Sequence, residues 1–274
     1  ISGNYYVGCI VGFNKGRINN CNVSGYVTGI SVIGGIAGQN EDTIKNCSAA
    51  SNCYASGERL SGSTVGGIAG RCVDGAISNC HSTGNIKGDM VEIGGIVGQI
   101  EFSTVTRCYS TGNITGGSFV GGIAGLNQEG TISICYATGN ISSNSNGCGG
   151  IVGSNGAGYG GSGITINCYA TGNVTGTEDA GGVAGSNNDT ILYCYATGKV
   201  TGSYIGGVVG NNYDATAIQC NWNKETTGMI LGYDDEHSSF TGSALTTAQM
   251  RKASNFTGWD FNKVWVIRAD STYP

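Results

Sequence analysis

The sequence predicts an all-β fold: a right-handed parallel β-helix (β-solenoid) of about eight coils, closed by a C-terminal cap that contains a short helix. Two observations lead to this prediction. Glycine contributes 51 of 274 residues and proline only 1, while charged residues amount to 11%, a composition typical neither of collagen nor of a disordered chain. A unit of 26 to 28 residues also recurs along most of the chain. A period this short, without a helix-length apolar stripe, suits one coil of a solenoid.

A pair of glycines and a cysteine define the repeating unit. In most copies the cysteine follows the second glycine by 12 or 13 residues. The pairs are Gly34-Gly35, Gly66-Gly67, Gly94-Gly95, Gly121-Gly122, Gly149-Gly150, Gly181-Gly182 and Gly206-Gly207, preceded by a first copy in which Gly8-Cys9 takes this place. The cysteines are Cys21, Cys47, Cys80, Cys108, Cys135, Cys168, Cys194 and Cys220. Since no phosphate-binding loop or helix follows the glycines, we expect them to allow close backbone packing.

The alternation of side chains assigns the faces of each coil. Ile132, Cys135, Ala137 and Ile141 are predicted to point inward, and the residues between them outward. Corners need a backbone that tolerates left-handed geometry, which Asn and Gly do. We expect corners at Asn20, Asn46, Asn52, Asn79 and Asn167, just before the cysteine, and at Gly25, Gly57, Gly84, Gly112, Gly139, Gly172 and Gly198, four residues after it.

Stacking of coils at about 4.8 Å turns the outward positions into two ladders. The predicted aromatic ladder comprises Tyr54, His81, Tyr109, Tyr136, Tyr169 and Tyr195. The predicted threonine ladder comprises Thr83, Thr111, Thr138, Thr171 and Thr197, with Ser56 at its start. Aromatic rings beside hydroxyls can bind a glycan or a partner strand, and the same stacking can serve only to stabilise the sheet. These residues are the candidate ligand-binding site.

The cysteine column is expected to consist of free, buried thiols. Residues stacked on successive coils point the same way, whereas a disulfide needs Cβ atoms about 3.8 Å apart and a particular torsion. The candidate exception is a disulfide between Cys47 and Cys53, because a six-residue insertion repeats Asn46-Cys47 as Asn52-Cys53. A linear stack of thiols offers no closed ligand shell, so we expect no metal site there.

The repeat ends after Cys220. We therefore predict a solenoid domain over residues 1–221 and a capping segment over residues 222–274, which holds all three tryptophans, Trp222, Trp259 and Trp265. Leu245 to Lys252 is predicted as a short helix with Thr246 or Thr247 as its N-cap. Such a cap would cover the unpaired strand edges that end a solenoid.

The units Val-Gly-Gly-Ile-(Ala/Val)-Gly and Ile-x-x-Cys-Tyr-Ala-Thr-Gly-Asn-Val-Thr-Gly resemble the GLUG-motif repeats of bacterial surface and secreted proteins. Those proteins include adhesin-like proteins and the repeat regions of IgA-cleaving metallopeptidases. The tail from Leu245 to Met250 and from Phe256 to Phe261 resembles the segment that often closes such arrays. The resemblance implies a β-solenoid at an extracellular or cell-surface location and supplies no catalytic residue. The chain departs from the motif in using Ile or Val where Leu is common, at Cys9 and in the insertion.

Charge and hydropathy bear on the partners. The formal net charge is −5 and no basic run is present, so we expect no nucleic acid partner. No window approaches the roughly 18 apolar residues needed to span a bilayer, so we expect no membrane insertion within this segment. The chain begins Ile1-Ser2-Gly3 inside a repeat, and we interpret it as a fragment of a larger exported protein.

Catalytic residues and cofactors are not predicted. The acidic pairs Glu41-Asp42, Glu178-Asp179 and Asp234-Asp235 fall at different positions of the repeat or outside it, whereas a β-helix polysaccharide lyase or glycoside hydrolase needs carboxylates on one face. Residues 234–237 could hold calcium in a loop, and a solvated acidic turn is the simpler interpretation.

We therefore predict a non-enzymatic structural or adhesive module of a bacterial cell-surface or secreted protein. Its repeated Tyr, Thr and Asn side chains would face a glycan or a protein of a host or neighbouring cell. Two alternatives stay open: a β-helix polysaccharide lyase or glycoside hydrolase, and a filament subunit that self-associates through its N-terminal end.

Overall fold

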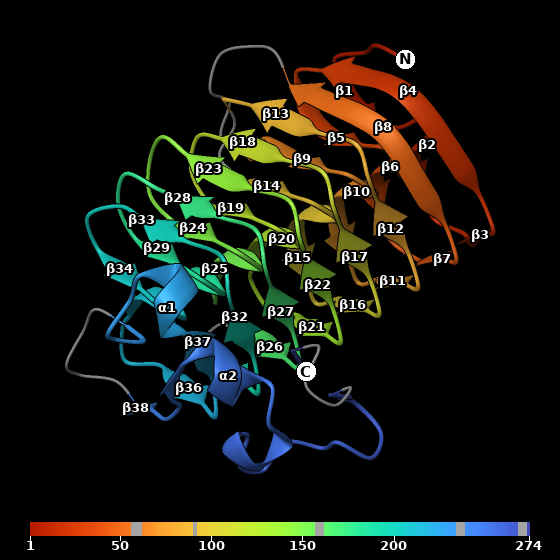
Figure 1. The fold of residues 1–274 in the computed structure, drawn as a ribbon. Coiled ribbons are helices and arrows are strands. Elements are labelled where there is room, and N and C mark those ends of the chain that lie inside the picture. The colour runs from red at the N-terminus through yellow and green to blue at the C-terminus, as the bar shows by residue number, and fades with distance from the viewer. Residues whose placement is uncertain (56–61, 90–91, 157–161, 234–238, 268–272) are drawn as a thin grey trace.

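The computed structural model describes residues 1–55, 62–89, 92–156, 162–233, 239–267 and 273–274. They wind into a parallel β-solenoid of about eight turns, with strands lying across its long axis (Figure 1). Every strand pairing is parallel, for example Tyr109 opposite Tyr136 and Val120 opposite Cys148. The predicted fold class is confirmed, including the short helix near the C-terminus. None of the helices in the described ranges is long and apolar enough to cross a membrane.

Four sheets form the walls, and each coil contributes to all of them. One sheet contains β1 (Tyr5–Val7), β5 (Ser31–Gly34), β9 (Thr64–Gly66), β14 (Glu92–Gly94), β19 (Val120–Gly121), β24 (Cys148–Gly149), β29 (Ala180–Gly181) and β34 (Ile205–Gly206). The next contains β2 (Val11–Asn14), β6 (Ala37–Asn40), β10 (Ala69–Val73), β15 (Val97–Glu101), β20 (Ala124–Asn127), β25 (Val152–Asn155), β30 (Ala184–Asn187) and β35 (Val209–Asn212).

The third sheet contains β3 (Ile18–Asn19), β7 (Thr43–Lys45), β11 (Ala76–Ser78), β16 (Thr104–Thr106), β21 (Thr131–Ser133), β26 (Ile164–Ile166), β31 (Thr190–Leu192), β36 (Thr216–Ile218) and β38 (Ser239–Phe240). The fourth begins with two long strands, β4 (Asn22–Gly29) and β8 (Ser48–Ala55), and then divides. One branch has β12 (His81–Ser82), β17 (Tyr109–Ser110), β22 (Tyr136–Ala137), β27 (Tyr169–Ala170), β32 (Tyr195–Ala196), β37 (Asn221–Asn223) and β39 (Ala244–Leu245). The other has β13 (Ile86–Gly88), β18 (Ile114–Gly116), β23 (Ile141–Ser143), β28 (Val174–Thr175) and β33 (Val200–Thr201).

Columns of branched aliphatic and cysteine side chains fill the interior. Ile132, Cys135, Ala137 and Ile141 are all at most 2% exposed, as predicted for the inward positions. Each fully buried Ile stabilises the fold by roughly 1.5–3 kcal/mol relative to an exposed one. Because successive coils are in register, each inward residue packs mainly on its counterparts above and below, so the core is continuous along the solenoid.

Close backbone approach explains the paired glycines. A Cβ added at Gly121 would lie 2.0 Å from the carbonyl oxygen of Ala124, and one at Gly122 would lie 2.1 Å from that of Gly150. Neither position can hold a side chain without a shift of the backbone. The predicted packing role of the pair is therefore confirmed.

The predicted corners are confirmed only in part. Asn20, Asn46, Asn79 and Asn167 have φ between 52° and 55°, the left-handed geometry expected of them. Asn52 is wrong, because the insertion lies inside the continuous strand β8.

The glycine column after the cysteine has a different origin from the one predicted. Gly25 does have φ of 111°. In the later coils, however, a Cβ at Gly112 would lie 1.9 Å from the carbonyl oxygen of Gly84, and one at Gly139 would lie 1.9 Å from that of Gly112. Glycine is needed there because adjacent coils touch. Gly57 lies outside the described residues.

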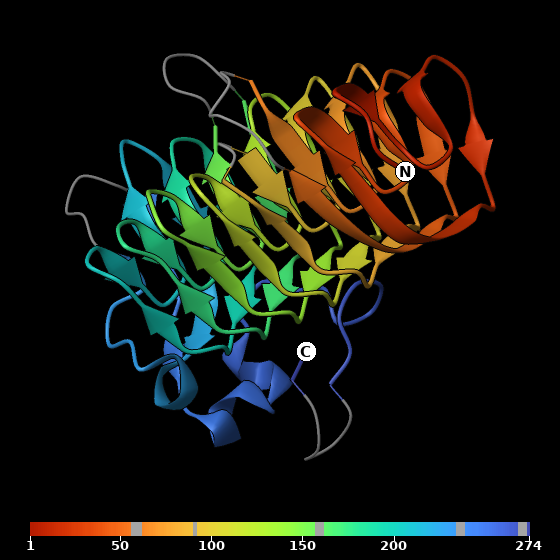
Figure 2. The same cartoon turned by 90° about the horizontal axis from the view of Figure 1, so that it is seen from above.

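The C-terminal segment closes the last coil and then folds back along one flank (Figure 2). β38 pairs with β36, and β39 pairs with β37. α1 (Lys224–Thr227) lies between β37 and β38. α2 (Thr247–Met250) and a 3₁₀ turn, η1 (Ala253–Asn255), follow β39. Thr246 is the N-cap of α2 and forms a capping box with Gln249, which confirms one of the two predicted caps.

Candidate functional site

Five aromatic side chains form a stack on the outer face of the fourth sheet. We call them the aromatic column: His81, Tyr109, Tyr136, Tyr169 and Tyr195, on β12, β17, β22, β27 and β32. Ring centroids of neighbours lie 4.7–5.0 Å apart with interplanar angles of 3–6°. In-register parallel pairing causes this, because it places equivalent side chains directly above one another at the coil spacing.

Tyr54 does not belong to the aromatic column, so the sequence-based assignment is wrong at this residue. In β8 it is Ser48 that pairs with His81, whereas Tyr54 pairs with Lys87 of β13. The insertion places the second Asn-Cys motif one face further along the coil. Tyr54 is therefore an exposed residue on the neighbouring branch of the sheet.

The threonine ladder follows the aromatic column two residues further along the chain. Thr83, Thr111 and Thr138 are exposed, Thr171 is half-buried and Thr197 is buried. The carbonyl oxygen of Thr197 accepts a hydrogen bond of 2.6 Å from the hydroxyl of Thr226 in α1. The ladder is thus open over the middle coils and covered near the C-terminal end. Ser56 lies outside the described residues.

The C-terminal segment covers one end of the aromatic column. Tyr195 is 2% exposed, and its hydroxyl donates to the main-chain oxygen of Pro274 at 2.7 Å. The ring of Trp265 lies 6.2 Å from that of Tyr169 and 5.7 Å from that of Tyr195. Trp259 packs on Tyr195 from 6.2 Å. Towards the middle coils the column is half-buried and open.

A cleft of about 480 Å³ lies where the covered part of the column meets the open part. Its sheet side is formed by Tyr136, Tyr169, Ile134 and Arg107. Its other side is formed by the C-terminal segment through Val264, Trp265, Val266, Tyr273 and Pro274. The Asn167 side chain joins the two sides by accepting a hydrogen bond from the Trp265 indole at 3.4 Å. The cleft is therefore mainly apolar, with hydroxyl, amide and guanidinium groups at its edges.

Comparison with known families identifies the repeat. The family model of the GLUG motif matches residues 92–115 and 176–201. The chain carries GLUG repeats. The first matched stretch contributes Tyr109 to the aromatic column and the second contributes Tyr195. Comparison with curated proteins and with solved structures gives no match.

Burial raises the pKa of two tyrosines of the aromatic column. Desolvation, reinforced by the neighbouring Tyr136, raises the pKa of Tyr169 to about 12. Desolvation and Tyr109 likewise raise the pKa of Tyr136. At neutral pH these hydroxyls are therefore hydrogen-bond donors as well as acceptors.

The cysteines of the GLUG repeats are free thiols, and the candidate disulfide between Cys47 and Cys53 is wrong. Cys47 packs in one core cluster and Cys53 in another, with most of the extended strand β8 between them, so their Cβ atoms cannot approach. In the cysteine column, the Cys47 thiol donates to the carbonyl oxygen of Lys45 at 3.0 Å. Desolvation raises the pKa of Cys47 to about 11 and that of Cys53 to about 12.

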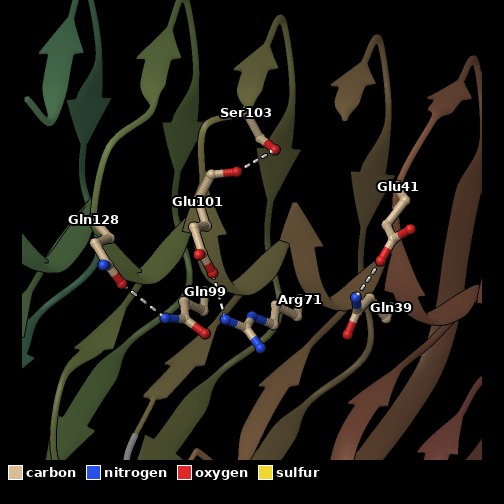
Figure 3. A network of polar contacts seen from close by, with 7 residues as sticks. All are labelled: Gln39, Glu41, Arg71, Gln99, Glu101, Ser103 and Gln128. Atoms are coloured by element: carbon tan, nitrogen blue, oxygen red, sulfur yellow. Dashed lines mark hydrogen bonds and ion pairs between the residues drawn. The ribbon is translucent and has the colours of Figure 1, made fainter. Parts of the chain in front are cut away.

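A second polar cluster was not anticipated from the sequence. The Arg71 guanidinium forms an ion pair with Glu101, and Gln99 donates to Gln128 at 3.1 Å (Figure 3). The ion pair of Arg71 and Glu101 also affects Glu92 of β14. Desolvation raises the pKa of Glu92 to about 7; Arg71 opposes this rise and Glu101 reinforces it. Its Oε2 atom is buried and has no partner among the described residues.

A column alignment of the repeats does carry the signal for this cluster. Gln39, Arg71 and Gln99 each follow their double glycine by four residues, and Glu41 and Glu101 follow by six. The adjacent acidic pairs, by contrast, occupy different positions of the repeat and give no such signal. The loop at residues 234–237, considered for calcium, lies outside the described residues.

Proposed function

We propose that this chain is a non-enzymatic structural and adhesive module of a bacterial cell-surface or secreted protein. The observation that carries the proposal is the aromatic column, which stands open beside the threonine ladder over the coils of His81, Tyr109 and Tyr136. An outer face of repeated tyrosine edges and hydroxyls, fixed on a solenoid, presents the same groups at a constant spacing to a partner.

The solenoid itself supports the structural half of the proposal. Backbone hydrogen bonds connect each coil to the next along the whole array, as between Thr138 and Ser110 or Thr171 and Ala137. Four continuous sheets around a packed core make a stiff scaffold whose length follows the number of repeats. The proposed exported location rests on the occurrence of similar repeats in bacterial surface proteins.

The adhesive half is tested by a binding screen on the full chain. The wild-type protein, Tyr136→Ala and the control Tyr213→Ala are applied to a glycan array and to a library of displayed peptides. Tyr213 is an exposed tyrosine outside the aromatic column. We expect binding that Tyr136→Ala weakens at least about tenfold and that Tyr213→Ala leaves unchanged. Binding that survives Tyr136→Ala, or no binding in either screen, would argue against adhesion through this face.

The cluster of Arg71, Glu92 and Glu101 supports a second candidate, a β-helix polysaccharide lyase or glycoside hydrolase. Glycoside hydrolysis commonly uses a pair of carboxyl groups, of which the general acid has a raised pKa. Glu92 has that raised pKa, and Glu101 forms an ion pair with Arg71. Turnover on a polysaccharide panel that is lost in Glu92→Gln and in Glu101→Gln, and kept in Glu129→Gln, would establish this function instead.

A further inference from the structure

The aromatic column offers ring edges to a partner, and its ring faces are occupied. Neighbouring rings are parallel within 6° and separated by at most 5.0 Å between centroids. Each tyrosine face between Tyr109 and Tyr169 is therefore covered by the next ring. Sugars bind aromatic side chains mainly by laying a pyranose on a free face, and this arrangement leaves none on the tyrosines in the middle of the column. Outward they present ring edges and hydroxyl groups.

The chain's own C-terminal segment shows what packs on these edges. Trp265 meets Tyr169 and Tyr195 at an interplanar angle of 53°, and Trp259 meets Tyr195 at 39°. Such tilted contacts are favoured over a face-to-face sandwich when one ring packs against another. The Tyr195 hydroxyl in addition donates to a main-chain oxygen of the segment, that of Pro274.

The same surface continues beyond the segment. Tyr136 and Tyr109 repeat the position of Tyr169 and Tyr195 one and two coils further, in unbroken register. The cleft at this junction already has one aromatic and apolar wall supplied by the chain, through Trp265 and Val266. Val266 is 66% exposed and Ile134 is 36% exposed, so apolar surface stands free on both sides. The open column thus extends an existing peptide–column interface.

From this continuity we propose that the open half of the aromatic column binds an extended polypeptide segment with aromatic side chains, seated in the cleft against Tyr136 and Ile134. The inference rests on the proposed adhesive function and narrows its partner from a glycan or protein to a protein. Aromatic side chains of the partner pack on the ring edges of Tyr136 and Tyr109, as Trp265 does on Tyr169 and Tyr195. The Tyr136 hydroxyl donates to a main-chain oxygen of the partner, as the Tyr195 hydroxyl does to that of Pro274.

Selection from a library of displayed random peptides on the full wild-type chain tests the proposal. Peptides that also bind Ile134→Asp are discarded, since this change places a charge in the cleft and leaves the aromatic column intact. We expect the surviving peptides to be rich in Trp and Tyr. In fluorescence anisotropy their affinity should fall at least about tenfold with Tyr136→Ala and about two- to tenfold with Tyr136→Phe, which removes one hydrogen bond.

The control is Tyr213→Ala, which should leave the affinity unchanged, and circular dichroism verifies that each variant keeps its β-structure. A glycan array is probed in parallel with the same proteins. If no cleft-dependent peptide is selected while a glycan binds in a Tyr136-dependent manner, the peptide proposal is overturned and the adhesive function stands. If neither peptide nor glycan binds, both are overturned. Peptides without aromatic residues, or equally sensitive to Tyr213→Ala, would also contradict the inference.

Discussion

At the residue scale, one backbone position of the repeat has the same left-handed geometry in every coil. The residue before the cysteine has φ near 50° whatever its side chain. Four coils use asparagine there, while others use Arg107, Ile134, Tyr193 or Gln219. The left-handed region costs non-glycine residues roughly 1–2 kcal/mol, and asparagine tolerates it best because its side chain bonds locally. A β-branched residue at this corner is the most strained choice.

We therefore expect Ile134→Asn to raise the free energy of unfolding by about 1 kcal/mol. Ile134 is 36% exposed, so the change removes little buried surface. The measurement is the urea midpoint. Ile164→Asn serves as the matched control, because Ile164 has the same exposure and lies in β26. It should be neutral or destabilising. Equal effects of the two substitutions would show that φ is not the cause.

Glu92 gives the fold a dependence on pH. The unfolded carboxyl releases its proton near its ordinary pKa of 4.5, whereas desolvation holds the folded one to about 7. Between these values the folded state holds more protons than the unfolded state, so the free energy of unfolding falls as pH rises. The full loss is on the order of 3 kcal/mol at most. Glu92→Gln should remove this fall and be the more stable protein at pH 8. Parallel pH profiles of wild type and variant in chemical denaturation would refute the assignment.

At the element scale, asparagine forms ladders that were missed from the sequence. In the interior, Asn127 donates to Asn155, and Asn155 donates to Asn187, both at 2.9 Å. The Thr165 hydroxyl also donates to Asn155, at 2.9 Å. On the surface, the backbone of Asn113 donates to the Asn85 side chain at 2.9 Å. The inner ladder satisfies buried carbonyl groups at a corner, while the outer one competes with water.

The two ladders should differ in their contribution to stability. Asn155→Ala removes several buried hydrogen bonds, among them those with Asn127, Asn187 and Thr165, and a buried polar group left without a partner costs about 1–3 kcal/mol. We expect a total destabilisation of about 3 kcal/mol or more. Asn113→Ala removes an exposed bond, the one that the Asn113 side chain accepts from the Asn140 backbone at 3.0 Å, and should cost about 1 kcal/mol or less. Thermal unfolding of both variants checks this, and a larger loss for Asn113→Ala would reverse the interpretation.

Particular elements show how far the sequence could predict the fold. Periodicity was sufficient for the coils, because identical residues at a fixed spacing have only one in-register arrangement, and Cys135 and Ile141 are buried as expected. It failed at β8, where two Asn-Cys motifs compete for one position. Only the pairing of Ser48 with His81 decides between them, and that pairing depends on how the longer strand bends, which local pattern does not encode.

At the scale of the whole molecule, the C-terminal segment protects two surfaces at once. Through β38 and β39 it pairs with strands of the last coil. Through Trp259 and Trp265 it covers the end of the aromatic column. The tryptophans could be predicted to pack on something, but not on the column, because their target lies 64 to 96 residues earlier in the chain and is fixed only by the folded path.

Loss of this cover should make the protein associate. In the double variant Trp259→Ala, Trp265→Ala the column end at Tyr195 and the adjoining apolar surface become exposed. Each substitution should also destabilise the fold by about 3 kcal/mol or more. Light scattering should then reveal concentration-dependent assembly, which Tyr213→Ala should not produce. Electron microscopy distinguishes ordered filaments from amorphous aggregates. A monomeric double variant would contradict a protective role of the segment.

The orientation of the strands has a mechanical consequence. Because the strands lie across the long axis, the hydrogen bonds between coils run along it (Figure 1). When the two ends of the solenoid are pulled apart along this axis, the load falls on the hydrogen bonds that hold the outermost coil. We therefore expect the coils to unfold one after another. A freed coil of 26 to 28 residues lengthens from about 4.8 Å to about 90 Å. Under load the chain would thus extend in steps of similar length, while the remaining coils stay folded.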